Sequence, residues 1–289
     1  FDDTTRATPA SIIAPIVVEE LKAGGIKDEN ILFIAMVGSH RALTQPEVRT
    51  KLGDDIVDTY PWINHNPYDQ LVDLGTSSHG NHFKVDFYFM QADVKVSISG
   101  IKKHGAGYSG GAKAILPGVS SVDSIEYLHQ KIRWGGLGKI YHNDARADME
   151  EVARRSGLDF SINTIMNEKR QPIGIHAGDV IEAFRSACHD AVKQYTTEIA
   201  RDADVVIANC YPMVRDTSGF GFANQSLREG GTAIVIWQLP LVKSSIHYFA
   251  ERRKYTGKSF WENQQVRDPV KKAGQIIVFS QYIQRRDML

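Results

Sequence analysis

The chain has 289 residues, of which 42% are hydrophobic, and its 34 basic residues balance its 34 acidic residues. This apolar content is sufficient for buried cores, and the length allows two domains of ordinary size. Without a net charge or a basic run among aromatic residues, the sequence does not favour binding to nucleic acid or to an anionic membrane. We therefore expect a small-molecule ligand.

The two cysteines, Cys188 and Cys210, have neither the number nor the spacing of a disulfide framework or a zinc knuckle, as is typical of a reducing compartment. The apolar run at 233–242 is too short to span a bilayer, and no signal peptide is recognisable. The chain begins at Phe1, without a strand before its first helix, so we expect the natural protein to have a preceding segment. These features predict a cytoplasmic protein.

The first predicted element is an amphipathic helix over 11–22. Asp3 and Arg6 then fall in the loop that leads into the N-terminus of this helix. Such a loop is suited to binding an anion. Alternatively, the two side chains pair with each other and cap the helix, and the residues alone do not separate these possibilities.

An apolar run at 30–37 predicts a buried strand of the parallel type. His40 follows directly after the strand and a glycine, at the edge where α/β sheets bind their ligands. Thr44 and Glu47 have the spacing of a capping box, which predicts a supporting helix to about residue 52.

The segment 60–80 is predicted to be rich in loops. His65, His79 and His82 match no metal-ligand spacing and have no accompanying cysteine or paired carboxylates, so we interpret them as surface or turn residues. Alternating residues at 84–88 and 93–99 predict two further strands.

The stretch 104–118 contains five glycines and one residue that is certainly charged, Lys113, which is the composition of a binding loop. Three of its glycines satisfy G-x-G-x-x-G, but Pro117 would interrupt the helix that a dinucleotide fingerprint opens. A Walker A loop is excluded as well, because alanines flank Lys113 and no hydroxyl is available for magnesium.

A helix at 122–132, capped by Ser120 or Ser121, carries His129, which the residues alone favour as a packed or exposed histidine. Gly135 to Gly138 is predicted to be a plain turn. The remaining pattern predicts helices at 144–156 and 179–193, a strand at 160–166, and three short buried strands at 204–210, 232–238 and 275–280. The fold class is α/β, with two α/β domains, 1–194 and 195–289, and a cofactor and active-site cleft between them.

Four features stand out along the chain: Asp3-Thr-Thr-Arg6-x-Thr-Pro, Gly38-Ser-His40-Arg41, Ala106-Gly-Tyr-Ser-Gly-Gly-Ala-Lys113-Ala-Ile-Leu-Pro-Gly, and His129. Together they resemble the nickel-pincer lactate racemases and their homologues, over nearly the whole chain. The resemblance implies an isomerase that inverts C2 of a 2-hydroxy acid by reversible hydride transfer. The sequence does not identify the acid.

The resemblance implies a nickel-pincer nucleotide (pyridinium-3-thioamide-5-thiocarboxylic acid mononucleotide) attached covalently to Lys113, with His129 as the protein's ligand to nickel. It also implies accessory enzymes that make this cofactor. A desolvated lysine is a competent nucleophile, and imidazole suits nickel. The remaining implied cofactor contacts are Ser109, Gly110, Gly111 and Trp261.

In the family, two histidines flank the α-carbon of the substrate. His40 matches the first, and His104 is the candidate for the second, although its spacing to the lysine motif is one residue shorter than in the family. Arg6 would bind the substrate carboxylate and Asp3 would orient neighbouring groups. Two alternatives stay open: a nicotinamide-dependent 2-hydroxy acid dehydrogenase, and a noncatalytic nucleotide-binding protein of the same fold.

Overall fold

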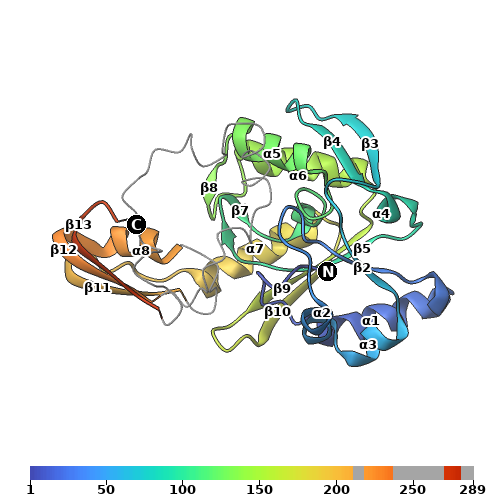
Figure 1. Cartoon of the computed structure of the whole chain (residues 1–289), viewed down its shortest axis with the longest axis horizontal. Helices are drawn as coiled ribbons and strands as arrows, with labels where there is room; N and C mark the ends of the chain where they lie inside the picture. The colour runs from blue at the N-terminus through green and yellow to red at the C-terminus, as the bar shows by residue number, and fades with distance from the viewer. Residues whose placement is uncertain (211–217, 237–269, 281–289) are drawn as a thin grey trace. The chain divides into compact units, whose positions relative to one another are not determined.

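A computed structural model describes residues 1–210, 218–236 and 270–280 (Figure 1). Contacts divide the chain into two units, Phe1–Thr196 and Thr197–Leu289. The first unit contains α1 (Ala10–Ala23), β1 (Phe33–Ala35), α2 (Gln45–Leu52), α3 (Asp54–Thr59), β2 (Trp62–Asn64), β3 (Leu71–Thr76), β4 (His82–Asp86), α4 (Phe87–Gln91), β5 (Val96–Gly100), β6 (Lys103–His104), β7 (Ala106–Tyr108), the 3-10 turn η2 (Gly111–Ala114), α5 (Val122–Lys131), β8 (Gly136–Leu137), α6 (Asp144–Arg155), β9 (Phe160–Met166), β10 (Pro172–Gly178) and α7 (Glu182–Tyr195).

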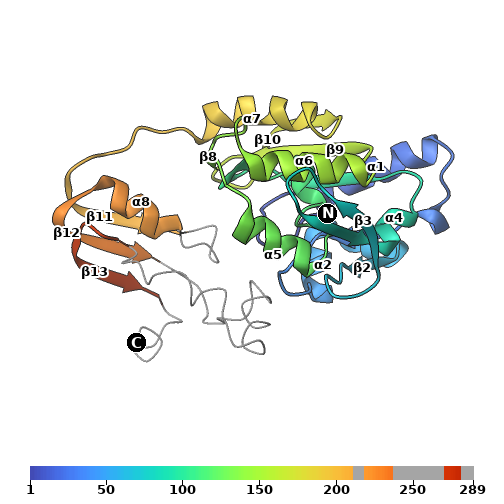
Figure 2. The same cartoon turned by 90° about the horizontal axis from the view of Figure 1, so that it is seen from above.

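A three-stranded sheet in the order β10-β9-β5 forms the centre of the first unit. β5 pairs with β9 in parallel, with Ile98 opposite Ile162, and both side chains pack in the core that includes Ile13 of α1. Ile165 belongs to the core on the opposite face, together with Phe184 of α7. Figure 2 shows α7 lying along β9 and β10. Helices therefore cover both faces of this sheet, and the predicted α/β class is confirmed.

The second unit contains β11 (Ala203–Asn209), α8 (Ser218–Ser226), β12 (Leu227–Ile236) and β13 (Ala273–Phe279). The three strands form a parallel sheet in the order β11-β12-β13. The predicted strands are therefore present, but the expectation that all three are buried is wrong for the described residues, since Ile207 is 64% and Phe279 61% exposed. The assignment of separate domains at residue 194 stays a prediction.

Three local predictions need correction. The strand expected at 30–37 is shortened to β1, because the chain already turns at Val37 and Gly38. The segment 60–80 contains β2 and β3, and β3 pairs with β4 as an antiparallel hairpin. The expected plain turn at Gly135 to Gly138 contains β8, which pairs in parallel with β7 of the glycine-rich stretch. Short pairings of this kind depend on distant partners, which local residue patterns do not reveal.

The predicted capping box of α2 is confirmed. α5 is capped by Ser121, whose hydroxyl accepts a hydrogen bond from the Ser124 N–H. Among the described helices, none has both the length and the apolar composition that crossing a bilayer requires.

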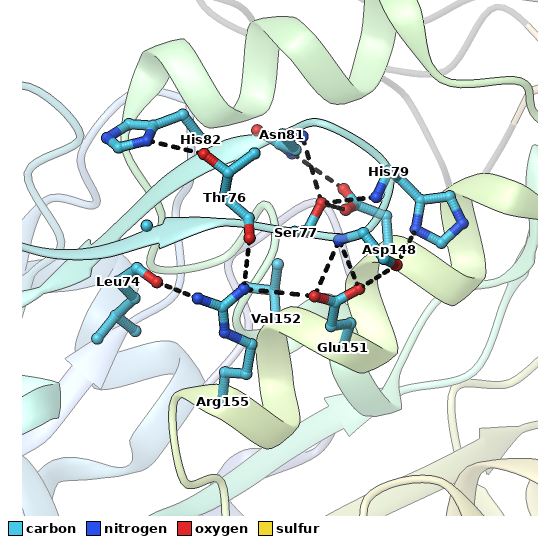
Figure 3. Close-up of polar contacts among 12 residues, drawn as sticks. Leu74, Thr76, Ser77, His79, Asn81, His82, Asp148, Glu151, Val152 and Arg155 are labelled. Atoms are coloured by element: carbon cyan, nitrogen blue, oxygen red, sulfur yellow. Dashed lines mark hydrogen bonds and ion pairs between the residues drawn. The ribbon is translucent and has the colours of Figure 1, made fainter.

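A polar network attaches the turn between β3 and β4 to α6 (Figure 3). Asp148 of α6 is fully buried and accepts hydrogen bonds from the Ser77 hydroxyl at 2.5 Å and the Asn81 amide at 2.9 Å. Arg155, two turns further along α6, donates to the carbonyl oxygens of Leu74 and Thr76. Ser124 of α5 holds the same hairpin, because its hydroxyl donates to the His82 carbonyl oxygen and accepts from the Lys84 N–H.

Replacing Asp148 by alanine is expected to lower the free energy of unfolding by about 1–3 kcal/mol, because Ser77 and Asn81 would keep buried donors without this acceptor. Relief of the buried charge will offset part of the loss, since burial raises the pKa of Asp148. Urea unfolding measures the change. Arg154→Ala, an exposed position on the same helix, is the control and should shift stability by less than about 0.5 kcal/mol. Equal effects of the two substitutions would contradict a stabilising role for the network.

Candidate functional site

Asp3 and His40 form a hydrogen-bonded pair beyond the end of β1. Nδ1 of His40 lies 2.5 Å from Oδ2 of Asp3, and the Asp3 side chain is buried while that of His40 is 24% exposed. Burial opposes ionisation of Asp3, but His40, followed by Arg6 and Thr5, holds the pKa of its carboxyl well below the usual range. Asp3 is therefore a carboxylate that accepts a hydrogen bond from Nδ1–H. In a neutral His40 the lone pair then lies on Nε2.

Thr5 connects Arg6 to this pair. Nη1 of Arg6 donates to the Thr5 hydroxyl oxygen at 2.7 Å, and the Thr5 hydroxyl donates to Oδ1 of Asp3. Because arginine only donates and a carboxylate only accepts, the direction of every hydrogen bond from Arg6 through Thr5 to Asp3 is fixed. We call Arg6, Thr5, Asp3 and His40 the arginine–histidine relay.

The relay bears on one interpretation of the N-terminal loop, the pairing of Asp3 with Arg6 to cap α1. Among the described contacts there is no direct ion pair between Asp3 and Arg6, and the N-cap position of α1 is Pro9, without a side-chain cap. Lys51 of α2 holds the loop in place. Its amine donates to the Arg6 carbonyl oxygen at 2.9 Å and lies 2.7 Å from Oδ1 of Asp2. The loop is thus held in place while the guanidinium of Arg6 remains half-buried at its surface.

A backbone contact joins the His40 loop to the glycine-rich stretch. The Gly38 N–H donates to the Gly118 carbonyl oxygen at 2.9 Å. Gly38 has φ +53°, and a Cβ there would lie 2.8 Å from the carbonyl oxygen of Pro117. Only glycine permits this approach, so the two loops are fixed side by side.

The glycine-rich stretch begins as the β6–β7 hairpin and continues into η2, which carries Lys113. The Gly111 N–H donates to Oδ1 of Asn163 on β9 at 2.8 Å, and a Cβ on Gly110 would lie 2.8 Å from the same oxygen. The Ser109 hydroxyl donates to the Gly100 carbonyl oxygen at 2.6 Å. The predicted cofactor residues Ser109, Gly110 and Gly111 therefore fasten the stretch to the sheet.

Arg146 of α6 holds the stretch from the other side. Its buried guanidinium donates to the carbonyl oxygens of Ala106 and Gly110, each at 3.3 Å, and to that of Tyr108. It also stacks on Phe184, with its central carbon 4.0 Å from the ring centroid. Burial lowers the pKa of Arg146 to about 10, which leaves it a cation at neutral pH. The lysine loop is thus built around a fixed positive charge.

The amine of Lys113 lies deep among protein atoms, although the residue as a whole is half-buried. Burial, followed by the charges of Arg6 and Arg146, lowers the pKa of Lys113 well below its usual value. No hydrogen bond or ion pair to this amine is found within the described part of the chain. A neutral buried amine is a nucleophile, which is the chemistry required for covalent attachment.

His104 lies on β6, opposite Gly107 of β7. Its Nδ1 accepts a hydrogen bond from the Ala106 N–H at 3.2 Å. Burial and then the charges of Lys113 and Arg6 lower its pKa well below the usual value. His104 is therefore a neutral imidazole near the amine of Lys113.

His129 lies on α5 and donates from Nδ1 to the carbonyl oxygen of Ile125, at 2.7 Å. In this tautomer the lone pair lies on Nε2, one of the two ring nitrogens through which histidine can bind a metal, and the carbonyl fixes the ring orientation. Burial lowers the pKa of His129 to about 4, partly opposed by the Ile125 carbonyl. The ring is neutral at pH 7, as a metal ligand must be.

Trp134 lies beside both histidines, with its ring centroid 5.3 Å from that of His104 and 5.1 Å from that of His129. Its indole N–H donates to the Leu128 carbonyl oxygen at 3.1 Å. The aromatic ring thus packs the loop histidine and the helix histidine against a common surface.

The structure brings six of the predicted residues together in the first unit: Asp3, Arg6, His40, His104, Lys113 and His129. Trp261 lies outside the described residues. In the described ranges, no group of three or more histidine, cysteine or carboxylate side chains is arranged to hold a metal ion.

His65 is not the surface residue that its loop position suggested. It is buried, with Nδ1 2.8 Å from Asp86 and Nε2 3.0 Å from the Ser120 carbonyl oxygen. Through these two contacts, His65 and Asp86 form a buried structural pair. The spacing of histidines along the sequence does not predict a buried pair of this kind, because Asp86 lies 21 residues away.

Sequence reasoning also missed Thr5, Trp134, Arg146 and Asn163. A signal existed for Arg146, which shares the buried face of α6 with Met149 and Ala153, three and seven residues further on. An arginine on an apolar helix face requires buried acceptors, and here these are the loop carbonyls.

The first unit thus gathers Lys113, whose pKa is lowered, three histidines and an arginine around one glycine-rich stretch. Residues 1–135 match the family described as the lactate racemase N-terminal domain. The resemblance to lactate racemases that the motifs indicated is confirmed.

Two relatives of the chain are named lactate racemase. The chain is 32% identical over 250 residues to lactate racemase of Lactiplantibacillus plantarum, an alignment that covers 81% of this chain and 58% of the relative. It is 27% identical over 246 residues to lactate racemase of Thermoanaerobacterium thermosaccharolyticum, covering 81% and 57%. The chain thus spans little more than half the length of these relatives.

Solved structures share the fold. The lactate racemase apoprotein from T. thermosaccharolyticum superimposes with a TM-score of 0.75 at 23% identity, covering 96% of this chain and 73% of that one. A protein from Thermotoga maritima superimposes with a TM-score of 0.71 at 18% identity, covering 98% and 82%.

Proposed function

We propose that this chain is the catalytic part of a racemase or epimerase that inverts C2 of a small 2-hydroxy acid with a nickel-pincer nucleotide attached to Lys113. The observation that carries the proposal is the placement of a buried lysine of lowered pKa beside His129, His104 and the arginine–histidine relay. The similarity to two lactate racemases makes lactate the first substrate to test.

The residues fit the cofactor. Lys113 offers a buried amine, and His129 presents the lone pair of Nε2, so attachment and nickel ligation would come from η2 and α5. When bound, the nucleotide would supply a hydride acceptor and the remaining donor atoms for nickel. The loop backbone fixed by Asn163 and Arg146 would position the ring.

The relay fits a 2-hydroxy acid. Arg6 would bind the substrate carboxylate through its guanidinium, whose orientation Thr5 sets. Nε2 of His40 would take the proton of the substrate hydroxyl, and Asp3 would stabilise the imidazolium that forms. We place His104 beside the substrate as the second histidine.

The test is to produce the protein together with the cofactor-making enzymes and to incubate each enantiomer of lactate deuterated at C2. We expect interconversion of the enantiomers with the deuterium retained, measured by chiral chromatography and mass spectrometry. Accumulation of 2-keto acid that depends on added nicotinamide nucleotide would support the dehydrogenase alternative. Cofactor binding without turnover of lactate or of other 2-hydroxy acids would support the noncatalytic alternative.

A further inference from the structure

The backbone that leads to Lys113 offers its carbonyl oxygens in alternation to two different partners. Backbone N–H groups at β8 and directly after it donate to the carbonyl oxygens of Gly105 and Gly107. The alternate carbonyl oxygens accept from one guanidinium, that of Arg146: they are those of Ala106, Tyr108 and Gly110. Arg146 therefore provides for alternate residues of the glycine-rich stretch the donors that a neighbouring strand provides for the others.

The last of these carbonyls connects Arg146 to Lys113. The Gly110 carbonyl oxygen accepts from Nη1 of Arg146 and from the backbone N–H of Lys113, each at 3.3 Å. The carbonyl oxygen of Lys113 in turn accepts from the Gly118 N–H at 3.1 Å. Both polar backbone groups of Lys113 are thus bonded, and one of them shares its acceptor with the guanidinium.

Arg146 is itself held in one place. Its side chain is 1% exposed, and its guanidinium stacks on the ring of Phe184 at 4.0 Å. A Cβ on Gly111 would lie 2.8 Å from the Cβ of Phe184, so this side chain supports both the guanidinium and η2. Packing alone does not require a cation here, because an apolar side chain of similar volume fills buried space at a lower desolvation cost. The distinct contribution of Arg146 is therefore its directed set of hydrogen bonds.

We propose that Arg146 is a positioning residue for cofactor attachment, which holds the glycine-rich stretch in the conformation that presents Lys113 before the cofactor binds. This proposal rests on the function proposed above. A planar guanidinium carries several donors in a fixed fork and can reach three carbonyl oxygens at once, whereas an ammonium on a shorter reach cannot. A stretch without this support would have to be ordered during attachment, which slows the reaction.

Hydrogen exchange of the cofactor-free protein, followed by mass spectrometry, tests the first part of the proposal. In Arg146→Met, peptides covering 106–118 should exchange about 10-fold faster, while peptides covering the β3–β4 turn at 77–81 should keep their protection. Asp148→Ala is the matched control, because Asp148 lies on the same helix and bonds to the turn instead of the stretch. It should give the reverse pattern. An equal rise in both peptides of Arg146→Met would mean a general structural role and would overturn the proposal.

The rate of attachment tests the second part. Cofactor-free protein is mixed with the cofactor-making enzymes, and the adduct on Lys113 is followed by intact mass. We expect attachment to be about 10–10²-fold slower in Arg146→Met, as for a misplaced reacting group, and much closer to the wild type in Asp148→Ala. An unchanged rate in Arg146→Met would refute the proposal.

Arg146→Lys keeps the charge without the fork and decides the matter if Arg146→Met does not fold. It should also show faster exchange of the stretch and slower attachment. Wild-type values of both in Arg146→Lys would overturn positioning by the guanidinium. If the wild-type protein forms no adduct, the proposed function fails, whereas hydrogen exchange still decides whether Arg146 positions the stretch.

Discussion

Replacing Lys113 by alanine is expected to abolish cofactor attachment completely. Lys113 is the lysine carried by η2, and burial, followed by the charges of Arg6 and Arg146, lowers the pKa of its amine well below the usual value. The measurement is intact mass and nickel content of protein produced with the cofactor-making enzymes. The wild type should carry an adduct of pincer-nucleotide size with bound nickel, and Lys113→Ala should carry neither. Lys103→Ala, on the same stretch, is the control and should keep both.

The lowered pKa of Lys113 can also be tested on the protein without cofactor, by measuring how readily its amine reacts. A lysine of ordinary pKa is almost fully protonated at pH 7, whereas a lowered pKa leaves more neutral amine at the same pH. An amine-reactive reagent small enough to enter should therefore label Lys113 at pH 7 more completely than Lys103, as peptide mass spectrometry would detect. Labelling of both lysines with the same rise towards pH 10 would contradict the account of the loop.

His40→Ala is expected to reduce turnover by about 10²–10⁴-fold while cofactor and nickel content stay at the wild-type level. His40 supplies the acceptor Nε2, but it lies on a different loop from Lys113 and from His129 on α5, so its removal should leave attachment intact. Arg41→Ala is the neighbouring control, because Arg41 pairs with Glu47 outside the relay. Loss of nickel in His40→Ala would mean that the residue supports the cofactor rather than the proton transfer.

Asp3→Asn tests the same relay from its other end. An amide at this position can donate to Nδ1 of His40, which would move the lone pair from Nε2 to Nδ1 and remove the base. We expect a loss of turnover comparable to that of His40→Ala, with nickel retained. Full activity in Asp3→Asn would show that the orientation of His40 does not depend on the carboxylate.

Sequence patterns predicted the elements that are locally determined. The helices α1, α2, α5, α6 and α7 and the strand β9 follow from apolar periodicity and capping residues, which act within a few neighbouring positions. The resemblance of the motifs then selected Lys113, and it selected His40 and His129 from the 10 histidines of the chain. The periodicity of α5 alone left His129 undistinguished from a packed histidine.

The parts that the sequence did not predict depend on contacts between distant positions. β8 forms because Gly136 and Leu137 meet β7 about 30 residues earlier. The tautomers of His40 and His104 follow from single hydrogen bonds to Asp3 and to Ala106, which no spacing rule reports. The sequence can predict that a histidine suits a catalytic site. Which of its ring nitrogens carries the hydrogen is known only from the position of its hydrogen-bond partner.

α6 contacts the lysine loop and the β3–β4 turn through neighbouring turns of one helix: Arg146 reaches the loop carbonyls, and Asp148 and Arg155 reach the turn. Random mutagenesis for altered activity would therefore recover substitutions in the turn as well as in the loop, because a shift of the helix moves both. Transplanting the glycine-rich stretch alone into another scaffold would leave its carbonyls without their cation. A portable unit would need this helix and also the sheet contacts at Asn163 and Gly100.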